Sequence, residues 1–361
     1  MRFSRRQFGM LALSSTIAPA VARAQRLPSV LEVPWLGEIQ TPPRPLPADL
    51  PRLRSLLMDA QGNKLANLEQ WKQQRAQLRE AWLNLLGVWH SPRRPPEYEI
   101  LESMRTATIS RQLIRYDSEW GVKCEAYLLR PSPAKEKMPG VVVFHSTVDY
   151  TIRQGAGLEG PPQAAWGLKL AERGFVVLCP RCFLWNDGRD VDYMQRVKEH
   201  RGRHPHAPGM AKMLCDGMRA VDLLASQPGV DPRRIGAAGH SLGAKEALYL
   251  AALDERIKAA VSSEGGVGTS FSNWEAPWYL ATKNFGREHH ELLGLAAPRA
   301  FLLIGGGSAD GAKSWPYIET ALEAYRLYGP IARIGLFNHG QGHTIPPVAE
   351  QRTYEWLQTY L

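Results

Sequence analysis

The chain from residue 140 onward alternates short apolar segments with helix-like segments, and this limits the possible folds more than any other feature. The apolar segments, such as "GVVVFH" and "FVVLCP", are continuous runs with no polar residue at every second position. Strands of this kind are buried on both faces, and their alternation with helices predicts a mostly parallel sheet flanked by helices. The expected fold class is therefore α/β, with functional residues at the carboxyl ends of the strands.

Residues 25–90 precede this pattern and have a different character. A proline-rich stretch that includes "TPPRPLPADLP" predicts an extended arm, and apolar residues at 3–4 spacing predict a helix closed by Gly87. Residues 107–117 and 122–131 are typical of paired antiparallel strands. We therefore expect an N-terminal arm and helix over residues 25–90 and a second, larger domain over residues 91–361.

The first 24 residues have the features of a targeting peptide. Arg2, Arg5 and Arg6 precede a short apolar stretch and a small-residue cleavage pattern, Ala22-Arg23-Ala24. The stretch "SRRQF" resembles the twin-arginine export signal, which is recognised by a receptor and does not act as an anchor. The protein is therefore expected to be periplasmic or secreted, with the twin-arginine export machinery as a partner.

The charge of the chain argues against nucleic-acid binding. Removal of residues 1–24 takes away four arginines and no acidic residue, so the net charge falls from +9 to +5. The sequence has no dense stripe of lysine and arginine with interleaved aromatic residues. No later stretch approaches the roughly 18 uninterrupted apolar residues of a membrane span, so none is expected in the mature chain.

Ser241 lies in "RIGAAGHSLGAKEALYL", between a predicted strand and a predicted helix. The central G-H-S-L-G fits the pattern G-x-S-x-G, in which small neighbours allow a turn so tight that the serine hydroxyl stands above the sheet edge. The next residue, Leu242, offers a backbone N–H at a helix N-terminus, which is half of an oxyanion hole. This strand-turn-helix context predicts that Ser241 is a nucleophile.

A serine nucleophile needs a base and an acid, and on such a sheet the chain order is serine, acid, histidine. His343 lies in the glycine-rich "FNHGQGHTIPP" after the last strand, which favours it over His339 at the strand end. For the acid, Asp310 follows the strand before the last one, and Glu264 follows the strand after the nucleophile helix. We favour Asp310 on its strand position, and Glu264 stays open as the alternative.

Further candidates surround the expected site. "FHSTVDY" follows the strand where the oxyanion loop is expected, so the backbone N–H of Ser146 or Thr147 is the second candidate donor. Residues 265–297 are expected to form an amphipathic wall, and residues 187–209 a polar loop beside the pocket. Four tryptophans follow strand ends and are expected either to anchor loops or to offer ring surfaces for sugar or aryl groups. They are Trp185, Trp274, Trp278 and Trp315.

No metal or cofactor site is expected. Cys179 and Cys182 have C-x-x-C spacing, but Cys179 ends a predicted buried strand, which favours two packed thiols over a disulfide. A zinc site needs a second ligand pair, and none has suitable spacing. His289 and His290 are adjacent, so their side chains point apart.

These segments resemble a known superfamily. From about residue 90 to 361 the chain resembles the α/β-hydrolase superfamily, and three stretches are similar to its dienelactone-hydrolase-like and acetyl xylan esterase-like group, and also to glucuronoyl esterases. The stretches are "GHSLGAKEALYLAALDERIKAAVSSEGG", "HHELLGLAAPRAFLLIGG" and "HGQGHTIP". The resemblance implies an α/β-hydrolase catalytic domain with an N-terminal helical and extended arm. It also matches Lys245 to a lysine that these enzymes carry four residues after the serine, and Glu264 to a glutamate that some of them use.

Two positions depart from the relatives. Ser241 stands where dienelactone hydrolases proper have a cysteine, so their activity is not implied. Leu242 stands where glucuronoyl esterases usually have arginine. For Lys245, a contact with a substrate carboxylate stays open beside a solvated position or pairing with a nearby acid.

The sequence therefore predicts an exported serine esterase for small-acyl or carbohydrate esters, similar to acetyl xylan esterases and needing no cofactor. A glucuronoyl methyl esterase-like enzyme and a serine peptidase of the same fold are the alternatives. Such a peptidase normally carries a large extra domain, and the first 90 residues are too short and too helical for one. A binding protein without activity is expected to lose the serine or the histidine, and both are present.

Overall fold

The computed structural model describes Met1 and residues 32–361, apart from residues 89–93, 186–191 and 283–284. The proposed export signal thus lies outside the described residues, except for Met1. The chain divides into two units, Met1–Leu31 and Glu32–Leu361, and the description below concerns the second. Among the helices of the described residues, none combines the length and apolar character needed to cross a membrane.

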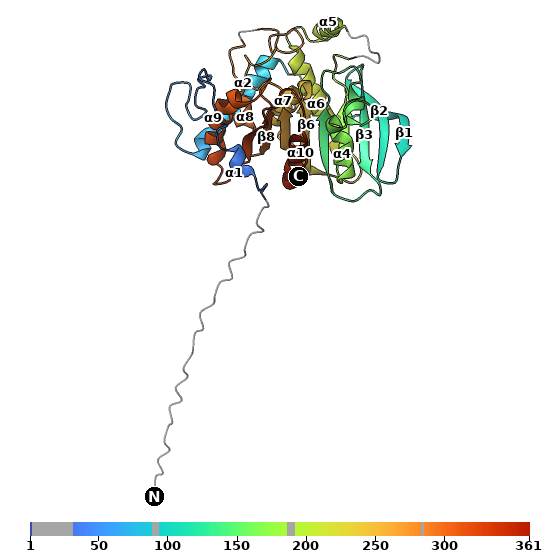
Figure 1. Ribbon diagram of the computed structural model, residues 1–361, viewed down its shortest axis with the longest axis horizontal. Coiled ribbons are helices and arrows are strands. Elements are labelled where there is room, and N and C mark those ends of the chain that lie inside the picture. The colour runs from blue at the N-terminus through green and yellow to red at the C-terminus, as the bar shows by residue number, and fades with distance from the viewer. Residues whose placement is uncertain (2–31, 89–93, 186–191, 283–284) are drawn as a thin grey trace. The chain divides into compact units, whose positions relative to one another are not determined.

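A nine-stranded sheet runs through the described part of this unit (Figure 1). The strand order across the sheet is β1-β2-β3-β5-β4-β6-β7-β8-β9. β1, β2, β3 and β5 pair antiparallel, and all neighbours from β5 to β9 pair parallel, so the mostly parallel sheet is confirmed. The strands are β1 (Tyr98–Arg105), β2 (Ile109–Glu119), β3 (Val122–Pro131), β4 (Met138–Phe144), β5 (Val176–Pro180), β6 (Val230–His240), β7 (Ile257–Ser263), β8 (Ala300–Gly305) and β9 (Ile334–Asn338).

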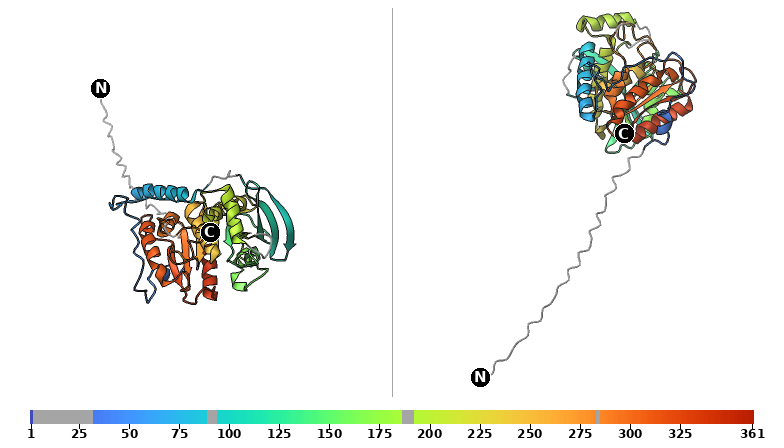
Figure 2. Two further views of the ribbon diagram at one scale, coloured as in Figure 1. Left: turned by 90° about the horizontal axis from the view of Figure 1, so that it is seen from above. Right: turned by 90° about the vertical axis from the view of Figure 1, so that its left-hand side faces the viewer.

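Helices cover both faces of the sheet (Figure 2). On one face the core includes residues of α2 (Leu68–Leu86), α6 (Gly209–Ala225), α7 (Leu242–Leu253), α8 (His290–Ala296) and α9 (Trp315–Arg326). On the other face it includes residues of α1 (Leu36–Ile39), α4 (Trp166–Glu172) and α10 (Pro347–Tyr360). Val142 packs in the first core, and Val141 and Val143 pack in the second, which explains why β4 is apolar at every position.

The N-terminal arm packs against the end of the chain. Trp35 stacks on Trp356 of α10 with ring centroids 5.7 Å apart, and Glu38 pairs with Arg352 at 2.7 Å. The predicted helix forms as α2, and Gly87 closes it in the left-handed conformation at φ 60°. The helix therefore forms as the sequence predicts, whereas the stretch expected to be an extended arm contains the short helix α1.

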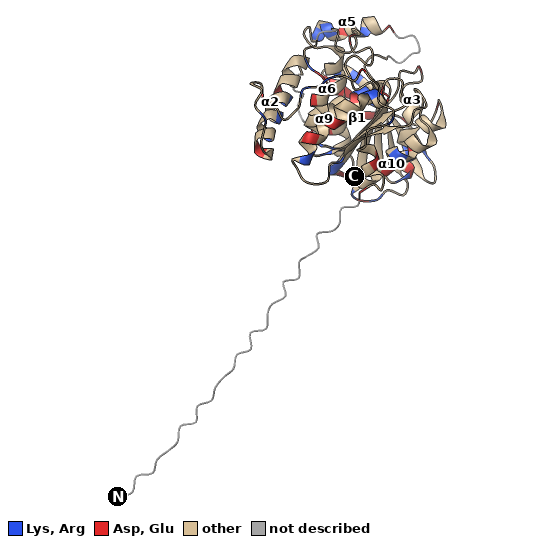
Figure 3. Cartoon of the chain, turned by 60° about the vertical axis from the view of Figure 1, so that its left-hand side comes forward, with Lys and Arg blue, Asp and Glu red and all other residues tan. Residues whose placement is uncertain are grey.

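β1 and α5 are among the elements that were not predicted from the sequence. β1 pairs with β2 although most of its side chains are exposed, so it lacks the apolar signal on which strand prediction depends. α5 (Tyr193–Arg203) lies within the stretch 187–209 that was expected to be a loop. Asp192 begins this helix by accepting hydrogen bonds from the backbone of Met194 and Gln195. Figure 3 shows basic residues along α5, and elsewhere basic and acidic residues are interspersed.

Three short helical elements complete the described fold. They are α3 (Ile152–Gly155), between β4 and α4, and two 3₁₀ turns, η1 (Pro162–Ala164) and η2 (Ala312–Ser314).

Candidate active site

Ser241 occupies a sharp turn between β6 and α7. Its φ is +58°, a conformation that a residue with a side chain rarely adopts. The two flanking glycines are required because the backbone segments almost touch. A Cβ on Gly239 would lie 2.2 Å from backbone atoms of Gly243, and a Cβ on Gly243 would lie 2.4 Å from the backbone oxygen of Phe144. The predicted strand-serine-helix turn is therefore present.

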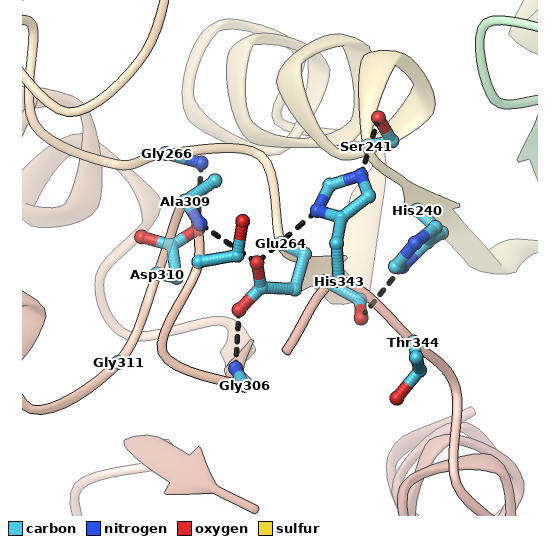
Figure 4. Close-up of polar contacts among 12 residues, drawn as sticks. His240, Ser241, Glu264, Gly266, Gly306, Ala309, Asp310, Gly311, His343 and Thr344 are labelled. Atoms are coloured by element: carbon cyan, nitrogen blue, oxygen red, sulfur yellow. Dashed lines mark hydrogen bonds and ion pairs between the residues drawn. The ribbon is translucent and has the colours of Figure 1, made fainter. Parts of the chain in front are cut away.

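Ser241, His343 and Glu264 form a continuous line of polar contacts (Figure 4). His343 Nε2 lies 2.9 Å from Ser241 Oγ, and His343 Nδ1 lies 3.2 Å from Glu264 Oε2. A carboxylate can only accept, so Nδ1 carries the proton and Nε2 is free to accept from the serine hydroxyl. This geometry allows His343 to act as a base toward Ser241.

Glu264 is fully buried directly after β7, and its backbone adopts a φ of +55°. Its carboxylate accepts hydrogen bonds from the backbone of Gly306 and from that of Ala309, the latter at 2.8 Å. Burial by itself would raise the pKa of Glu264, but the bonds from His343, Gly306 and Ala309 outweigh it and lower this pKa below its ordinary value. The carboxylate is therefore held charged beside His343.

The preference for Asp310 as the partner of His343 does not agree with the structure. Asp310 is buried, and its oxygens accept from the backbone N–H groups of Gly266 at 2.7 Å and Val267 at 2.8 Å and from Ser314 Oγ at 2.9 Å. These bonds tie the loop after β7 to the loop after β8. The acid that contacts His343 is Glu264. Strand position alone misled the prediction, because both acids follow neighbouring strands.

The other two histidines near the site do not contact Ser241 through a hydrogen bond. His339 Nδ1 accepts from the backbone of Gln341 at 3.2 Å. His240 packs its ring 4.8 Å from that of His343, and its Nδ1 contacts Ser263 Oγ at 3.1 Å. Burial lowers the pKa of His240 to about 3, so the His240 ring is neutral beside that of His343. The structure thus brings His343, rather than His339, to the serine.

The two candidate oxyanion donors lie in the loop between β4 and α3, residues 145–151, which is called the β4 loop below. They differ in the structure. The Ser146 N–H already donates to Gln154 Oε1 at 2.9 Å. Thr147 is exposed beside Ser241, and its N–H donates to no other described residue. Leu242 begins α7, where the first backbone N–H groups have no partner within the helix. Leu242 and Thr147 are therefore the available pair, and Ser146 as an alternative donor is not supported.

A cavity of about 360 Å³ opens beside Ser241 and His343. Its walls come from the β4 loop, α3, η1 and the loop after His343, and sequence reasoning missed most of them. Tyr150, Pro161 and Gln163 carry no chemical pattern that marks them before the fold is known. The lining residues are Ser146, Thr147, Val148, Tyr150, Gln154, Pro161, Gln163, Ala164, His240, Ser241, His343, Thr344 and Ile345.

The four tryptophans predicted as a substrate rim are not among these lining residues. Trp185, Trp274 and Trp315 are buried, and Trp278 is half-buried with its ring 5.6 Å from that of Tyr193. Trp274 Nε1 donates to the backbone oxygen of Gly266 at 2.7 Å. The rim prediction is therefore wrong for these residues, because their rings fill the packing between loops and helices.

Lys245 is also buried, which corrects both the solvated and the substrate-facing positions expected for it. Its Nζ lies 3.0 Å from Ser272 Oγ and 3.7 Å from the centroid of the Trp274 ring. Burial lowers the pKa of Lys245 to about 7, although the charges of Asp310 and Glu275 oppose this shift. Lys245 therefore belongs to the packing behind the site.

The described residues contain no group of three or more metal-ligating side chains that could hold an ion. Cys179 and Cys182 are free and buried, as the sequence predicts. Burial raises the pKa of the Cys182 thiol, so it stays protonated.

Known proteins share both the sequence pattern and the fold. The Dienelactone hydrolase family matches residues 124–279 of this chain. A hydrolase of Bacillus subtilis (strain 168) named YtaP is 29% identical over 191 residues, which cover 52% of this chain and 63% of that protein. The chain thus spans less than two thirds of the length of the curated relatives that it matches.

Solved structures extend the likeness beyond this segment. The glucuronoyl esterase from Solibacter usitatus superposes with a TM-score of 0.65 at 16% identity, over 87% of this chain and all of that one. Acetyl xylan esterase 1 from Thermoanaerobacterium sp. JW/SL YS485 gives a TM-score of 0.52 at 14% identity, over 80% of this chain and 94% of that one. The protein therefore has the α/β-hydrolase fold, and over residues 124–279 it matches the Dienelactone hydrolase family.

Proposed function

We propose that the protein is an exported serine hydrolase that cleaves carboxylic esters with small acyl groups or carbohydrate alcohols. The contact line from Ser241 through His343 to Glu264 carries this proposal. It supplies a nucleophile, a base within hydrogen-bond reach and a buried carboxylate that orients the base. The likeness to the Dienelactone hydrolase family supports a hydrolase of the esterase type.

The proposed mechanism needs only side chains and backbone of this chain. His343 Nε2 takes the proton of Ser241 Oγ while the oxygen attacks the ester carbonyl, and Glu264 stabilises the imidazolium. The backbone N–H groups of Leu242 and Thr147 donate to the oxyanion of the tetrahedral intermediate. The C–O bond to the alcohol then breaks, and His343 gives its proton to the leaving oxygen. Water, activated by His343, hydrolyses the acyl-enzyme and restores Ser241.

A glucuronoyl methyl esterase-like activity is the second candidate. Its support is the superposition on the Solibacter usitatus glucuronoyl esterase over the whole of that chain. The neutral, part-apolar cavity beside Ser241 suits a small ester group on a larger alcohol in either case. Acetyl, feruloyl and methyl-glucuronoyl esters assayed with purified protein distinguish the two activities.

Export is proposed from the first 24 residues alone. The basic start, apolar stretch and small-residue cleavage pattern fit a twin-arginine signal. Mass spectrometry of the exported protein is expected to give a chain that begins after Ala24. An uncleaved chain in the cytoplasm contradicts this part of the proposal and leaves the esterase chemistry untouched.

Replacement of Ser241 by alanine tests the esterase proposal directly. Ser241→Ala is expected to lower kcat by about 10⁶-fold and to abolish labelling by a fluorophosphonate probe, because the nucleophile is lost. The unfolding midpoint in urea serves as the control, and it is expected to stay close to that of the wild type. If the folded alanine variant keeps more than about a hundredth of the wild-type turnover, Ser241 is not the nucleophile.

A further inference from the structure

The side chain of Gln154, which lies outside the β4 loop, accepts a hydrogen bond from the backbone of this loop. Its Oε1 accepts the Ser146 N–H at 2.9 Å, and both groups are buried. Gln154 itself is 7% exposed and lines the cavity that also contains Ser241 and Thr147. The glutamine is therefore adjacent to the oxyanion hole without belonging to the contact line of Ser241.

The other polar groups of Ser146 are also occupied. Ser146 Oγ donates to the backbone oxygen of His240 at 3.2 Å, and His145 Nδ1 donates to the Ser146 oxygen at 2.7 Å. His145 Nε2 in turn accepts from the Cys182 backbone at 3.1 Å. These bonds fix the Ser146 peptide on three sides, so the direction of the next peptide N–H, that of Thr147, is fixed as well.

Gln154 is itself held firmly. It lies in α3, and a Cβ on its neighbour Gly155 would come within 2.9 Å of Cys179 Sγ, so α3 sits directly against β5. Thr151, at the start of α3, accepts a hydrogen bond from Arg181 at 3.2 Å. A residue held in this way can orient the loop without moving during a reaction.

We propose that Gln154 is a positioning residue for the oxyanion hole. By accepting the Ser146 N–H, it removes this donor from competition and aims the Thr147 N–H toward the carbonyl oxygen of an ester bound at Ser241. The inference rests on the esterase function proposed above. It assigns the second oxyanion donor to Thr147 and explains why a buried glutamine lines this cavity.

The test replaces Gln154 with methionine, which keeps the length of the side chain and removes the acceptor. Removal of a direct oxyanion donor lowers kcat by about 10²- to 10³-fold, so a misaimed donor is expected to lower it roughly 10- to 100-fold. KM for p-nitrophenyl acetate is expected to change by less than about threefold, because the ground-state ester gains little from the hole.

A transition-state analogue separates positioning from a general structural role. An aryl trifluoromethyl ketone adds to Ser241 Oγ and forms a tetrahedral oxyanion, so its Ki is expected to rise by about the same factor as kcat falls. Gln227→Met is the matched control, since Gln227 is also buried and its side-chain oxygen also accepts a hydrogen bond, from Tyr98 Oη at 3.2 Å, but it precedes β6, whereas Ser241 follows this strand, and it does not line the cavity. It is expected to leave kcat and Ki unchanged.

The possible results discriminate clearly. An unchanged kcat in Gln154→Met, a fall in kcat without a rise in Ki, or an equal effect in Gln227→Met overturns the positioning role. If the methionine variant does not fold, Gln154→Asn makes the same test, because its amide is one methylene too short to reach the Ser146 N–H. If wild-type protein neither hydrolyses esters nor binds the ketone, the proposed function fails instead.

Discussion

Two acidic residues lie on neighbouring loops of the site, and their hydrogen-bond partners decide what each can do. Glu264 meets His343 Nδ1, whereas Asp310 is surrounded by the Gly266 and Val267 N–H groups and the Ser314 hydroxyl. The first acid can orient a base, and the second can only hold the loop after β7 in place. This difference gives each acid its own experimental signature.

Exchange of each acid for its amide separates the two roles. Glu264→Gln is expected to lower kcat by about 10³- to 10⁴-fold, because an amide favours the wrong tautomer of His343. Asp310→Asn is expected to lower the free energy of unfolding by about 1–3 kcal/mol, since an amide NH₂ then faces buried donors. Turnover of p-nitrophenyl acetate and urea unfolding measure both effects. A folded Asp310→Asn protein with as large a loss of kcat as Glu264→Gln contradicts the assignment.

The burial of Lys245 predicts that the free energy of unfolding of the protein depends on pH. Burial lowers its pKa in the folded state to about 7, below its ordinary value of 10.5. Between roughly pH 7 and pH 10 the unfolded chain therefore binds one more proton than the folded chain, and the stability contributed by this residue rises with pH. We expect the unfolding free energy of wild type, relative to Lys245→Met, to be higher at pH 9 than at pH 7. A difference that is the same at both pH values contradicts the shift.

The sequence could identify residues whose role depends on local pattern, but not residues whose role depends on a distant partner. Ser241 and His343 follow from the G-x-S-x-G turn and the order of the chain. The choice between Glu264 and Asp310 depends on which loop reaches His343, and this is fixed by tertiary hydrogen bonds. Gln154 carries no pattern at all, because an isolated glutamine is equally common on any surface helix.

At the scale of elements, the turn between β6 and α7 depends on the absence of side chains. Gly243→Ala would place a Cβ 2.4 Å from the Phe144 backbone oxygen, and the backbone has no flexible end that can move aside. We expect a loss of about 1–3 kcal/mol in the free energy of unfolding and a lower kcat, because α7 must shift away from β4. Urea unfolding and turnover measure the two effects.

Gly217→Ala is the matched control within α6. A Cβ there meets Leu250 and the Phe144 ring at 3.4 Å, which is an ordinary contact. Alanine is favoured over glycine in a helix interior by about 1 kcal/mol, so this variant is expected to be as stable as wild type or more stable. Equal stability of the two variants would mean that the turn tolerates a side chain and does not need its glycines.

Elements with a long apolar pattern could be predicted from the sequence, and elements without such a pattern could not. The buried parallel strands and α2 show long apolar patterns, so their type follows from the sequence. β1 is held by pairing with β2 rather than by a buried face, and α5 is a mostly polar helix that begins at an Asp192 cap. Such elements are stabilised by neighbours and caps, which a search for apolar periodicity does not detect.

The whole molecule shows where the site opens, and this differs from the sequence prediction. The segment 265–297 is expected from the sequence to form an amphipathic wall of the site, but its Trp274 is buried and none of its residues lines the cavity beside Ser241. The cavity is instead bordered by the β4 loop, α3, η1 and the loop that follows His343. The β4 loop, α3 and η1 follow one another between β4 and α4, whereas the loop that follows His343 comes after β9. Ser241 lies beside the β4 loop because β4 and β6 are neighbours in the sheet.

This arrangement predicts a preference for short acyl groups. The cavity mixes apolar residues such as Val148 and Ile345 with polar ones such as Thr344 and Gln163. Burial of each methylene contributes about 0.8 kcal/mol, or roughly a fourfold gain in kcat/KM, when an acyl chain is fully covered. A mixed and open cavity cannot cover a long chain, so we expect this gain to stop near butyrate.

Specificity constants for p-nitrophenyl esters from acetate to palmitate measure the preference. We expect kcat/KM to fall beyond butyrate, and Ile345→Ala to change the ratio of butyrate to acetate because Ile345 lines the cavity. Trp274→Ala, whose ring is buried away from the cavity, is the control: it is expected to lower the free energy of unfolding by about 3–5 kcal/mol and to leave this ratio unchanged. A kcat/KM that climbs steadily beyond octanoate contradicts the short-acyl preference, since it requires a covered apolar channel that these walls do not form.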